Sequence, residues 1–368
     1  MKRLIVALIL QFAPASATMA AGLIEDSITL PARFEGTFGS YTANLDALVI
    51  RPNDSTPHPL AVINHGTPVS SIERRQVLPK GFRAQAQEFA RRGWIAITFT
   101  RRGFGNSEGA YAENSSVSCD SRDYEPVGRA SADDIREVIR LMREKPYVDG
   151  SKIISVGRSA GGFATVALTA NPPPGLVAAI SFAGGHGSSG TNHVCNEIAL
   201  IDAFATFGKT SRVPMLWVYA DNDHYFSPAL AQRMVTAFTE AGGNAEFIAA
   251  PPFGTDGHGL FSRAGTAIWS HYVDAFLEKQ NLKLVDQPLP IEDHVRYPTG
   301  LSDRGKAAFL DFLDAAGHKA FVISADEHFG WSNRRETAED AVEKALEICK
   351  NNTDRSCSAV MIDDQAMP

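Results

Sequence analysis

The sequence has few cysteines, no long hydrophobic run and no excess of basic residues. Cysteine accounts for 4 of its 368 residues, and the formal net charge is -7. The longest mainly apolar run near the start, residues 4–13, covers about ten residues, which is too short to span a bilayer. A negative net charge offers no clustered cationic surface for nucleic acid or an anionic membrane. We therefore expect no nucleic-acid partner and no stable membrane anchor.

The first twenty residues have the layout of a secretory signal peptide. Lys2 and Arg3 precede the apolar run, and small residues follow it. This order predicts a signal peptide over residues 1–20, cleaved after Ala17 or Ala20. A buried N-terminal helix is the alternative. No cysteine directly follows the run to carry a lipid anchor, so we expect a periplasmic or secreted protein.

The four cysteines are expected to form two disulfides, because thiols usually pair in the oxidising compartments that exported proteins reach. Cys349 and Cys357 are close in sequence and flank an expected turn between a helix and a strand. Cys119 and Cys195 both lie in polar, loop-like stretches. We predict the pairs Cys119–Cys195 and Cys349–Cys357, while three pairings are open from sequence alone.

Residues 21–280 alternate between expected strands and expected helices, after an opening antiparallel hairpin. Strands are expected at residues 27–30, 45–50, 60–64, 94–99, 152–156, 176–182, 214–219 and 245–249, and helices at residues 81–92, 133–143, 161–170, 198–207, 229–241 and 264–277. Ser131 and Asp134 predict a capping box at the start of the second helix. The alternation predicts an α/β fold: a doubly wound, mostly parallel sheet that binds ligands at the carboxyl ends of its strands.

A Pro-bearing polar stretch, residues 281–299, is expected to be a linker to a small α+β module at residues 300–368. The module's helices are expected at residues 303–316 and 336–350, its strands at residues 320–324 and 358–362, and a turn at residues 329–332. A module of about 70 residues buries a marginal core, which a Cys349–Cys357 disulfide would support. Phe329 and Trp331 are expected in that core, with a carbohydrate contact as the alternative.

The strongest chemical signal is Gly157-x-Ser159-x-Gly161, placed between an expected strand and an expected helix. The glycines permit a sharp turn that lifts the serine hydroxyl above the sheet, and the positive end of the helix lies beneath the oxyanion that forms there. We predict that Ser159 is a nucleophile, and a purely structural turn is the alternative.

A serine nucleophile needs a histidine base and an acid, which on this kind of sheet follow it in the order acid, then histidine. Asp223 and His258 both lie beyond the ends of expected strands, and His258 is flanked by glycines. We predict His258 as the base in preference to His224, which adjoins the acid. We predict Asp223 as the acid in preference to Asp221, which lies nearer the end of the strand.

The backbone N–H groups of Thr67 and Ala160 are the expected oxyanion hole. Ala160 follows the nucleophile directly, and Thr67 lies in the loop after the strand at residues 60–64. Pro68 has no N–H to donate. Arg158, directly before the nucleophile, is expected either to meet an acidic group of the substrate or to brace the edge of the sheet.

Together these residues resemble the α/β-hydrolase superfamily, and most closely its dienelactone-hydrolase-like and prolyl-oligopeptidase-like serine esterases. The similarity covers residues 40–280 and includes residues 101–109, Arg-Arg-Gly-Phe-Gly-x-Ser-x-Gly, which look like a loop common beside the active site in that superfamily. Dienelactone hydrolases proper use a cysteine where this sequence has Ser159, so lactone specificity is not implied. Residues 300–368 match no part of the superfamily's core.

The resemblance implies hydrolysis of a small-molecule carboxylic ester through an acyl-enzyme intermediate, with no cofactor. The same residues would also serve a peptidase, but the chain has no propeller-length N-terminal extension of the kind that gates oligopeptidases, which favours esters. An inactive binding protein on the same fold is a third possibility, and the intact catalytic candidates argue against it.

A metal site is not expected. His186, His193 and Cys195 could supply ligands, but loops rich in glycine and serine often carry such residues without a ligand role. The sequence gives no indication of the oligomeric state.

Overall fold

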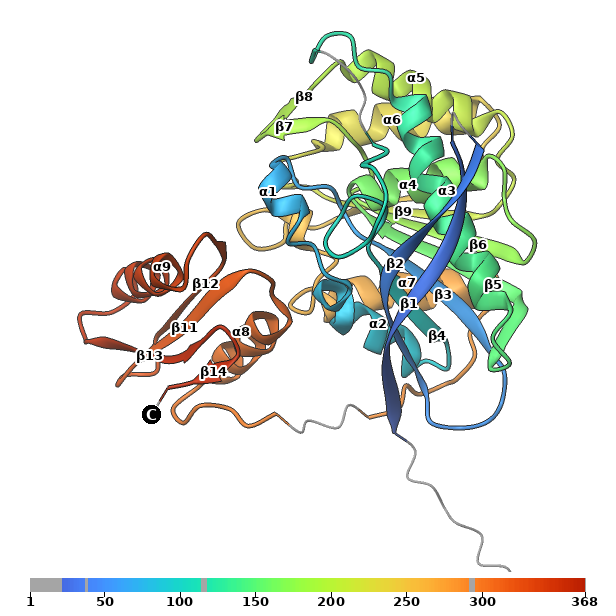
Figure 1. Ribbon diagram of the computed structural model, residues 1–368. Coiled ribbons are helices and arrows are strands. Elements are labelled where there is room, and N and C mark those ends of the chain that lie inside the picture. Colours follow the sequence, from blue (N-terminus) through green and yellow to red (C-terminus); the bar gives the residue numbers. More distant parts are fainter. Residues whose placement is uncertain (1–21, 37–38, 114–117, 291–294, 368) are drawn as a thin grey trace, which may run out of the picture.

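The computed structural model describes residues 22–36, 39–113, 118–290 and 295–367. Its main feature is an eight-stranded sheet in the order β1-β2-β4-β3-β5-β6-β9-β10 (Figure 1). The strands are β1 (Leu23–Gly36), β2 (Gly39–Pro52), β3 (His58–Asn64), β4 (Ile95–Phe99), β5 (Val148–Arg158), β6 (Leu176–Phe182), β9 (Met215–Ala220) and β10 (Ala245–Ala250). β1 and β2 form an antiparallel hairpin, β2 is antiparallel to β4, and every later pair is parallel. This is the mostly parallel sheet that the alternation predicts.

Helices cover both faces of this sheet (Figure 1). They are α2 (Arg83–Ala90), α3 (Tyr124–Arg143), α4 (Ala160–Thr169), α5 (Glu197–Gly208), α6 (Pro228–Glu240) and α7 (Thr266–Lys279), while the short α1 (Ser71–Arg74) buries no residue. Leu60 and Val62 of β3 pack in one hydrophobic cluster with α3, α4, α5 and α6. Ala61 and Ile63 point to the other face, into a cluster with α2 and α7. The alternation of side chains along each strand thus builds a core on both sides of the sheet.

The capping box expected at Ser131 is wrong. α3 begins at Tyr124 and is capped by the side chain of Asp123. Ser131 lies inside the helix, where its hydroxyl donates to a carbonyl one turn earlier (3.0 Å). Asp134 is buried and pairs with Arg102 (2.6 Å). These polar residues therefore form contacts within and beyond the helix, and do not mark its start.

The C-terminal part of the chain forms a separate four-stranded sheet in the order β12-β11-β13-β14, coloured orange to red in Figure 1. Its elements are α8 (Asp303–Asp314), β11 (His318–Ser324), β12 (Phe329–Arg335), α9 (Ala338–Lys350), β13 (Cys357–Ile362) and β14 (Gln365–Ala366). Phe321 and Ile323 of β11 pack against α8, whereas Ala320 and Val322 pack against α9. The small sheet therefore lies between two helices, as an α+β module.

The turn expected at residues 329–332 is wrong, because these residues form the first half of β12. A Cβ at Gly330 would come within 2.2 Å of a backbone oxygen of α9, so only glycine lets the strand pass this close to the helix. The buried hydroxyl of Ser332 donates to another carbonyl of α9 (2.6 Å). Phe329 and Trp331 pack against the aromatic core of the module, as predicted.

The module contacts the larger domain through ion pairs on α8. Arg263, which precedes α7, lies 3.0 Å from Asp311 and 2.5 Å from Asp314. Arg83 of α2 lies 3.8 Å from Asp314. Two arginines of the larger domain therefore hold the acidic end of one helix of the module.

Both predicted disulfides are present, Cys119–Cys195 in the larger domain and Cys349–Cys357 in the module. Among the helices of the described ranges, none has the length and apolar character required to cross a bilayer. The predicted signal peptide, residues 1–20, lies outside the described residues.

Candidate active site

Ser159 lies at a sharp turn between β5 and α4, as the glycine motif predicts. Its backbone has φ 58° and ψ -126°, which is unusual and strained for a residue with a side chain. A Cβ at Gly157 would lie 2.1 Å from the carbonyl oxygen of Gly161, and a Cβ at Gly161 would lie 2.2 Å from that of Asn64. The two glycines are therefore required for strand, turn and helix to pack this closely, and the turn exposes the serine hydroxyl to the pocket beyond.

Asp223 and His258 are in contact, although 35 residues separate them. Nδ1 of His258 lies 3.1 Å from Oδ2 and 3.3 Å from Oδ1 of Asp223. The buried carboxylate of Asp223 also accepts the backbone N–H groups of Tyr225 (2.8 Å) and Phe226 (2.9 Å), which fix its orientation. The backbone N–H of Asp221, in contrast, donates to the Ala250 carbonyl at the edge of the sheet.

His258 is held in place by Asp256 and Tyr225, which the sequence analysis did not predict as part of the site. The carboxylate of Asp256 accepts the backbone N–H of His258 (3.0 Å) and that of His224 (3.1 Å). The ring of Tyr225 lies against the His258 ring, with centroids 4.4 Å apart. An aspartate two residues before a histidine in a glycine-rich loop is a local turn signal that could have revealed Asp256. Tyr225 is placed only by the tertiary fold.

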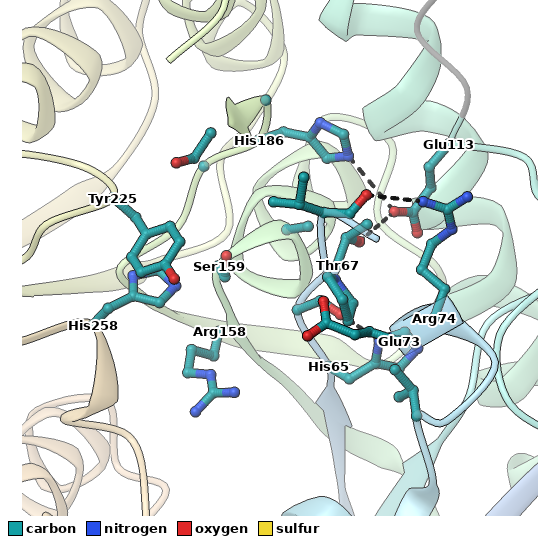
Figure 2. A pocket seen from close by; sticks show the side chains of 18 of the residues that line it. His65, Thr67, Glu73, Arg74, Glu113, Arg158, Ser159, His186, Tyr225 and His258 are labelled. Carbon is teal, nitrogen blue, oxygen red and sulfur yellow. Dashed lines mark hydrogen bonds and ion pairs between the residues drawn. The ribbon is translucent and has the colours of Figure 1, made fainter. Parts of the chain in front are cut away.

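Ser159 and His258 line one pocket of about 510 Å³ together with Thr67 and Ala160. In Figure 2, Ser159 lies between His258 and Tyr225 on one side and Thr67 on the other. Among the described residues, no hydrogen bond joins the Ser159 hydroxyl to His258, a separation that is common in unliganded hydrolases. His224 is not part of the pocket lining.

The loop that carries Thr67 passes close to Ser159. A Cβ at Gly66 would lie 3.1 Å from Cβ of Ser159, so the backbone approaches the serine as closely as a glycine permits. The Thr67 hydroxyl donates to Glu113 (2.6 Å), which turns this side chain away from the serine. The loop therefore presents backbone, not a bulky side chain, to Ser159.

A buried ionic cluster supports this loop from behind. Arg101 pairs with Glu113 and donates to the carbonyl of His65 (2.7 Å). Burial alone would raise the pKa of Glu113, but Arg101 and His186 hold it well below its usual range. Burial, assisted by the positive charge of Arg101, lowers the pKa of His65 to about 3, so the ring is neutral. Its Nε2 accepts the backbone N–H of Arg101 (3.0 Å). Arg101 comes from the expected glycine-rich loop, but its partner Glu113 carried no sequence signal.

Arg158 lies beside Ser159 at the end of β5. Its guanidinium carbon lies 5.0 Å from the centre of the Phe82 ring. Nε of Arg158 is buried without a hydrogen-bond partner. Burial and, next, the positive charge of Arg334 lower the pKa of Arg158 to about 10, so the side chain stays protonated at neutral pH. Arg334, from β12 of the module, also lines this pocket, which the sequence gave no reason to expect.

The residues considered for a metal site do not form one together. His193 lies near Cys119 and Cys195, with ligand-type atoms within 4.8 Å of one another. The two sulfur atoms form a disulfide, so neither is a thiolate that could bind a metal. His186 lies instead in the catalytic pocket, 3.6 Å from Glu113.

Comparison with known proteins gives one family match. The family model described as X-Pro dipeptidyl-peptidase of the S15 family matches residues 42–208. This range includes most of β2, the strands β3 to β6, the turn at Ser159 and α5. No curated protein has a significantly similar sequence.

Solved structures are similar at low sequence identity. An acylaminoacyl peptidase from Pyrococcus horikoshii is 15% identical with a TM-score of 0.52, over 73% of this chain and 43% of that protein. A structure from Bacteroides ovatus described as a dipeptidyl aminopeptidase IV is 16% identical with a TM-score of 0.51, over 73% of this chain and 37% of that protein. Esterase 2 of Thermogutta terrifontis is 18% identical with a TM-score of 0.48, over 71% of this chain and 96% of that protein.

The chain spans less than half of the length of these two peptidases. This chain has a mostly parallel eight-stranded sheet and a serine in the sharp turn after β5, and a sharp turn of this kind is typical of the α/β-hydrolase fold. The chain therefore has the α/β-hydrolase fold.

Proposed function

We propose that this chain is an exported serine hydrolase that cleaves carboxylic esters, with Ser159 as nucleophile, His258 as base and Asp223 as acid. The observation that carries the proposal is the Asp223–His258 contact at 3.1 Å on the same pocket as a serine in a strained turn between strand and helix. Acyl transfer requires a nucleophile and a base on one pocket, with an acid that contacts the base from behind.

In the proposed mechanism, His258 Nε2 takes the proton of the Ser159 hydroxyl as its oxygen attacks the ester carbonyl. Asp223 accepts the Nδ1–H and stabilises the imidazolium that forms. The N–H groups of Thr67 and Ala160 donate to the oxyanion of the tetrahedral intermediate. The alcohol leaves with the proton from His258, and water then attacks the acyl-enzyme by the same route, which releases the acid and restores the serine.

Peptide hydrolysis is the second candidate. The observation that favours it is the match to a family model described as X-Pro dipeptidyl-peptidase. The same residues would act, with His258 protonating an amine instead of an alcohol. An ester is the less demanding substrate because an alkoxide leaves more readily than an amide nitrogen, and the matched part excludes more than half of the similar peptidases.

Export of the protein is supported by two features. The basic start and short apolar run of residues 1–20 are typical of a signal peptide. The four cysteines form two disulfides, which persist in oxidising compartments such as a periplasm or the medium.

A fluorophosphonate probe tests the nucleophile. We expect labelling of the wild type and its loss in Ser159→Ala. Ser188→Ala is a matched control, since Ser188 lines the same pocket and should leave labelling intact. An unlabelled but folded wild type would exclude the serine hydrolase.

A substrate comparison separates the two candidate activities. We expect p-nitrophenyl acyl esters to be cleaved with a higher kcat/KM than peptide anilides, including an X-Pro anilide. A higher kcat/KM for the X-Pro anilide would assign the chain to the peptidases.

A further inference from the structure

The catalytic pocket contains more positive charge than its own acids neutralise. Its charged lining, apart from the histidines, consists of Arg74, Arg122, Arg158, Arg334, Glu73 and Glu113. Glu113 is already paired with the buried Arg101. One carboxylate, Glu73, therefore remains for four arginines, and it lies on α1, near Arg74 (Figure 2).

None of these four arginines has an anionic partner among the described residues. In the described ranges, no carboxylate lies within 4.0 Å of the guanidinium of Arg158 or Arg334. Nε of Arg158 is buried and makes no hydrogen bond. A buried donor without a partner costs free energy, and a second cation close by adds to that cost. A bound anion would remove both penalties, and a guanidinium matches the planar, two-oxygen geometry of a carboxylate.

Arg334 reaches the pocket because the module is fixed both locally and against the larger domain. Its backbone is left-handed, with φ 54°, and its N–H donates to the carbonyl of Ala316 (3.1 Å). Gly317 lies behind it, where a Cβ would come within 2.9 Å of Cα of Arg334. The ion pairs of Arg263 with α8 hold the module at this position. A side chain from outside the hydrolase fold thus completes the wall of the catalytic pocket.

We propose that Arg158 and Arg334 together bind a carboxylate of the substrate, so that the enzyme selects esters that carry a free carboxylate and the C-terminal module acts as its specificity element. This inference rests on the proposed ester hydrolase function. The carboxylate belongs either to the acyl group or to the alcohol, and the two sources call for different substrates in the test.

The test uses two pairs of esters that differ only in charge. Monomethyl adipate and methyl adipamate place the carboxylate or its neutral amide on the acyl side, whereas 4-acetoxybenzoate and 4-acetoxybenzamide place it on the leaving group. We expect the carboxylate member of one pair to have a kcat/KM at least about tenfold higher, mainly through KM, because a charged hydrogen bond remote from the reacting carbonyl contributes to binding. The pair that shows the preference identifies the side of the ester that carries the carboxylate.

Arg334→Gln should remove the preference, so that kcat/KM for the carboxylate ester falls to about that of its neutral amide. Arg355→Gln is the matched control, because it removes the same charge from an exposed position of the module that does not line the pocket. Equal kcat/KM within both pairs, or a preference that persists in Arg334→Gln, would overturn the proposal.

A binding measurement separates this inference from the proposed reaction. Calorimetry with Ser159→Ala should detect binding of monomethyl adipate or 4-acetoxybenzoate and no binding of the matching amide. The binding signal should disappear when Arg334→Gln is added to Ser159→Ala. If these compounds bind but the wild type does not hydrolyse them, the proposed ester hydrolase function is wrong and the proposed anion site is retained. If all four esters are hydrolysed without preference and binding does not depend on the carboxylate, the proposed anion site is wrong and the proposed hydrolase function is retained.

Discussion

The larger domain and the C-terminal module contribute to the catalytic pocket in different ways. In the larger domain, Ser159, Asp223 and His258 lie at the carboxyl edge of one sheet, so the fold that buries the core also assembles the site. The module supplies Arg334 from a second sheet, whose place depends on ion pairs across an interface. Residues that extend from a packed core resist displacement, whereas the position of a docked residue depends on the interface that holds it.

The larger domain gives the prediction with the largest effect. Asp223→Asn should lower kcat by about 10⁴-fold, because the asparagine would favour the wrong tautomer of His258. Steady-state kinetics with a p-nitrophenyl ester measures the change. Asp221→Asn is the matched control, since Asp221 makes a backbone bond at the sheet edge and should keep most of the activity. The reverse result would assign the acid to Asp221.

Sequence alone could predict the larger domain's site better than the pocket as a whole. The glycine motif predicts Ser159 because the chemistry requires a turn that is local in the chain, and the residues after later strands predict Asp223 and His258. Glu113 and Arg334 were missed because they reach the pocket through loop packing and through docking of the module. Neither has a local pattern, since their roles depend on which distant segment lies beside them.

The lack of a local pattern for tertiary contacts also explains the two local features that were predicted wrongly, the capping box at Ser131 and the turn at residues 329–332. Ser131 and Asp134 were interpreted as a helix start because local capping and tertiary contacts use the same residue types. Gly330 and Ser332 were interpreted as a turn because a strand that passes close to a helix needs the same small residues. Periodicity predicted the longer helices and the strands of the large sheet, since burial of one face is a local requirement, but it did not predict short elements such as α1 and β14.

The two disulfides provide a direct comparison of the two regions. Cys119 and Cys195 are 76 residues apart, so Cys119→Ser with Cys195→Ser should lower the free energy of unfolding by about 4.5 kcal/mol, because a long loop gains much entropy in the unfolded chain. Chemical denaturation measures the loss. A change below about 1 kcal/mol would show that the loop is constrained without the bond.

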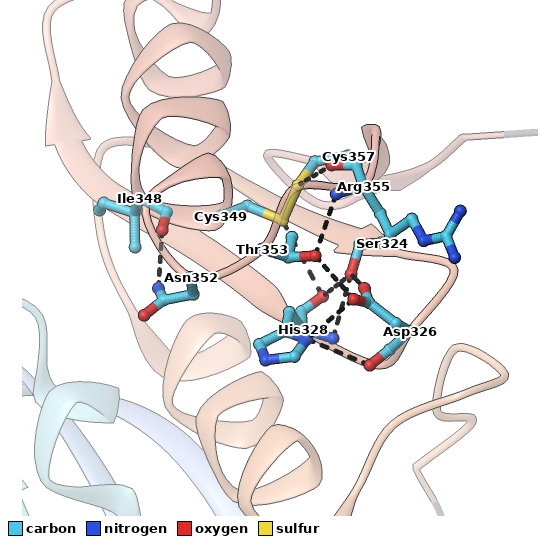
Figure 3. Close-up of a disulfide and its surroundings, with 9 residues drawn as sticks. All are labelled: Ser324, Asp326, His328, Ile348, Cys349, Asn352, Thr353, Arg355 and Cys357. Carbon is cyan, nitrogen blue, oxygen red and sulfur yellow. Dashed lines mark hydrogen bonds and ion pairs between the residues drawn. A yellow bond between two sulfur atoms is a disulfide. The ribbon is translucent and has the colours of Figure 1, made fainter.

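The disulfide of the module should contribute less to stability. Cys349 and Cys357 are 8 residues apart, at the end of α9 and the start of β13 (Figure 3). Replacing both with serine should lower the stability of the module by about 2.5 kcal/mol on the same chain-entropy account. Hydrogen exchange should show faster opening of α9 and β11 and unchanged protection of β5. Equal loss of protection in both regions would mean that the module and the larger domain unfold together.

The buried ring of His65 should make the larger domain sensitive to acid. Its pKa is about 3 in the folded chain and about 6.5 in the unfolded chain, so only the unfolded chain gains a proton as the pH falls below 6.5. Stability from this group is complete above pH 6.5, falls by about 2 kcal/mol by pH 5 and continues to fall toward pH 3. His65→Gln should reduce this slope in denaturant titrations, while His271→Gln, exposed on α7, should not. An unchanged slope in His65→Gln would assign the acid sensitivity to other groups.

A substitution in the interface between the module and the larger domain should have the smallest effect on stability and the most specific effect on substrate binding. Arg263→Gln removes two ion pairs with α8, which are partly exposed, and should weaken docking by about 1 kcal/mol. The module should still fold, because its core does not involve Arg263. We therefore expect faster protease cleavage in residues 281–290 and a higher KM for the carboxylate ester, with kcat for its neutral amide unchanged. Lys306→Gln, which breaks an exposed pair within α8, is the matched control. A KM that rises equally for both esters would mean that docking shapes the whole pocket and not the position of Arg334 alone.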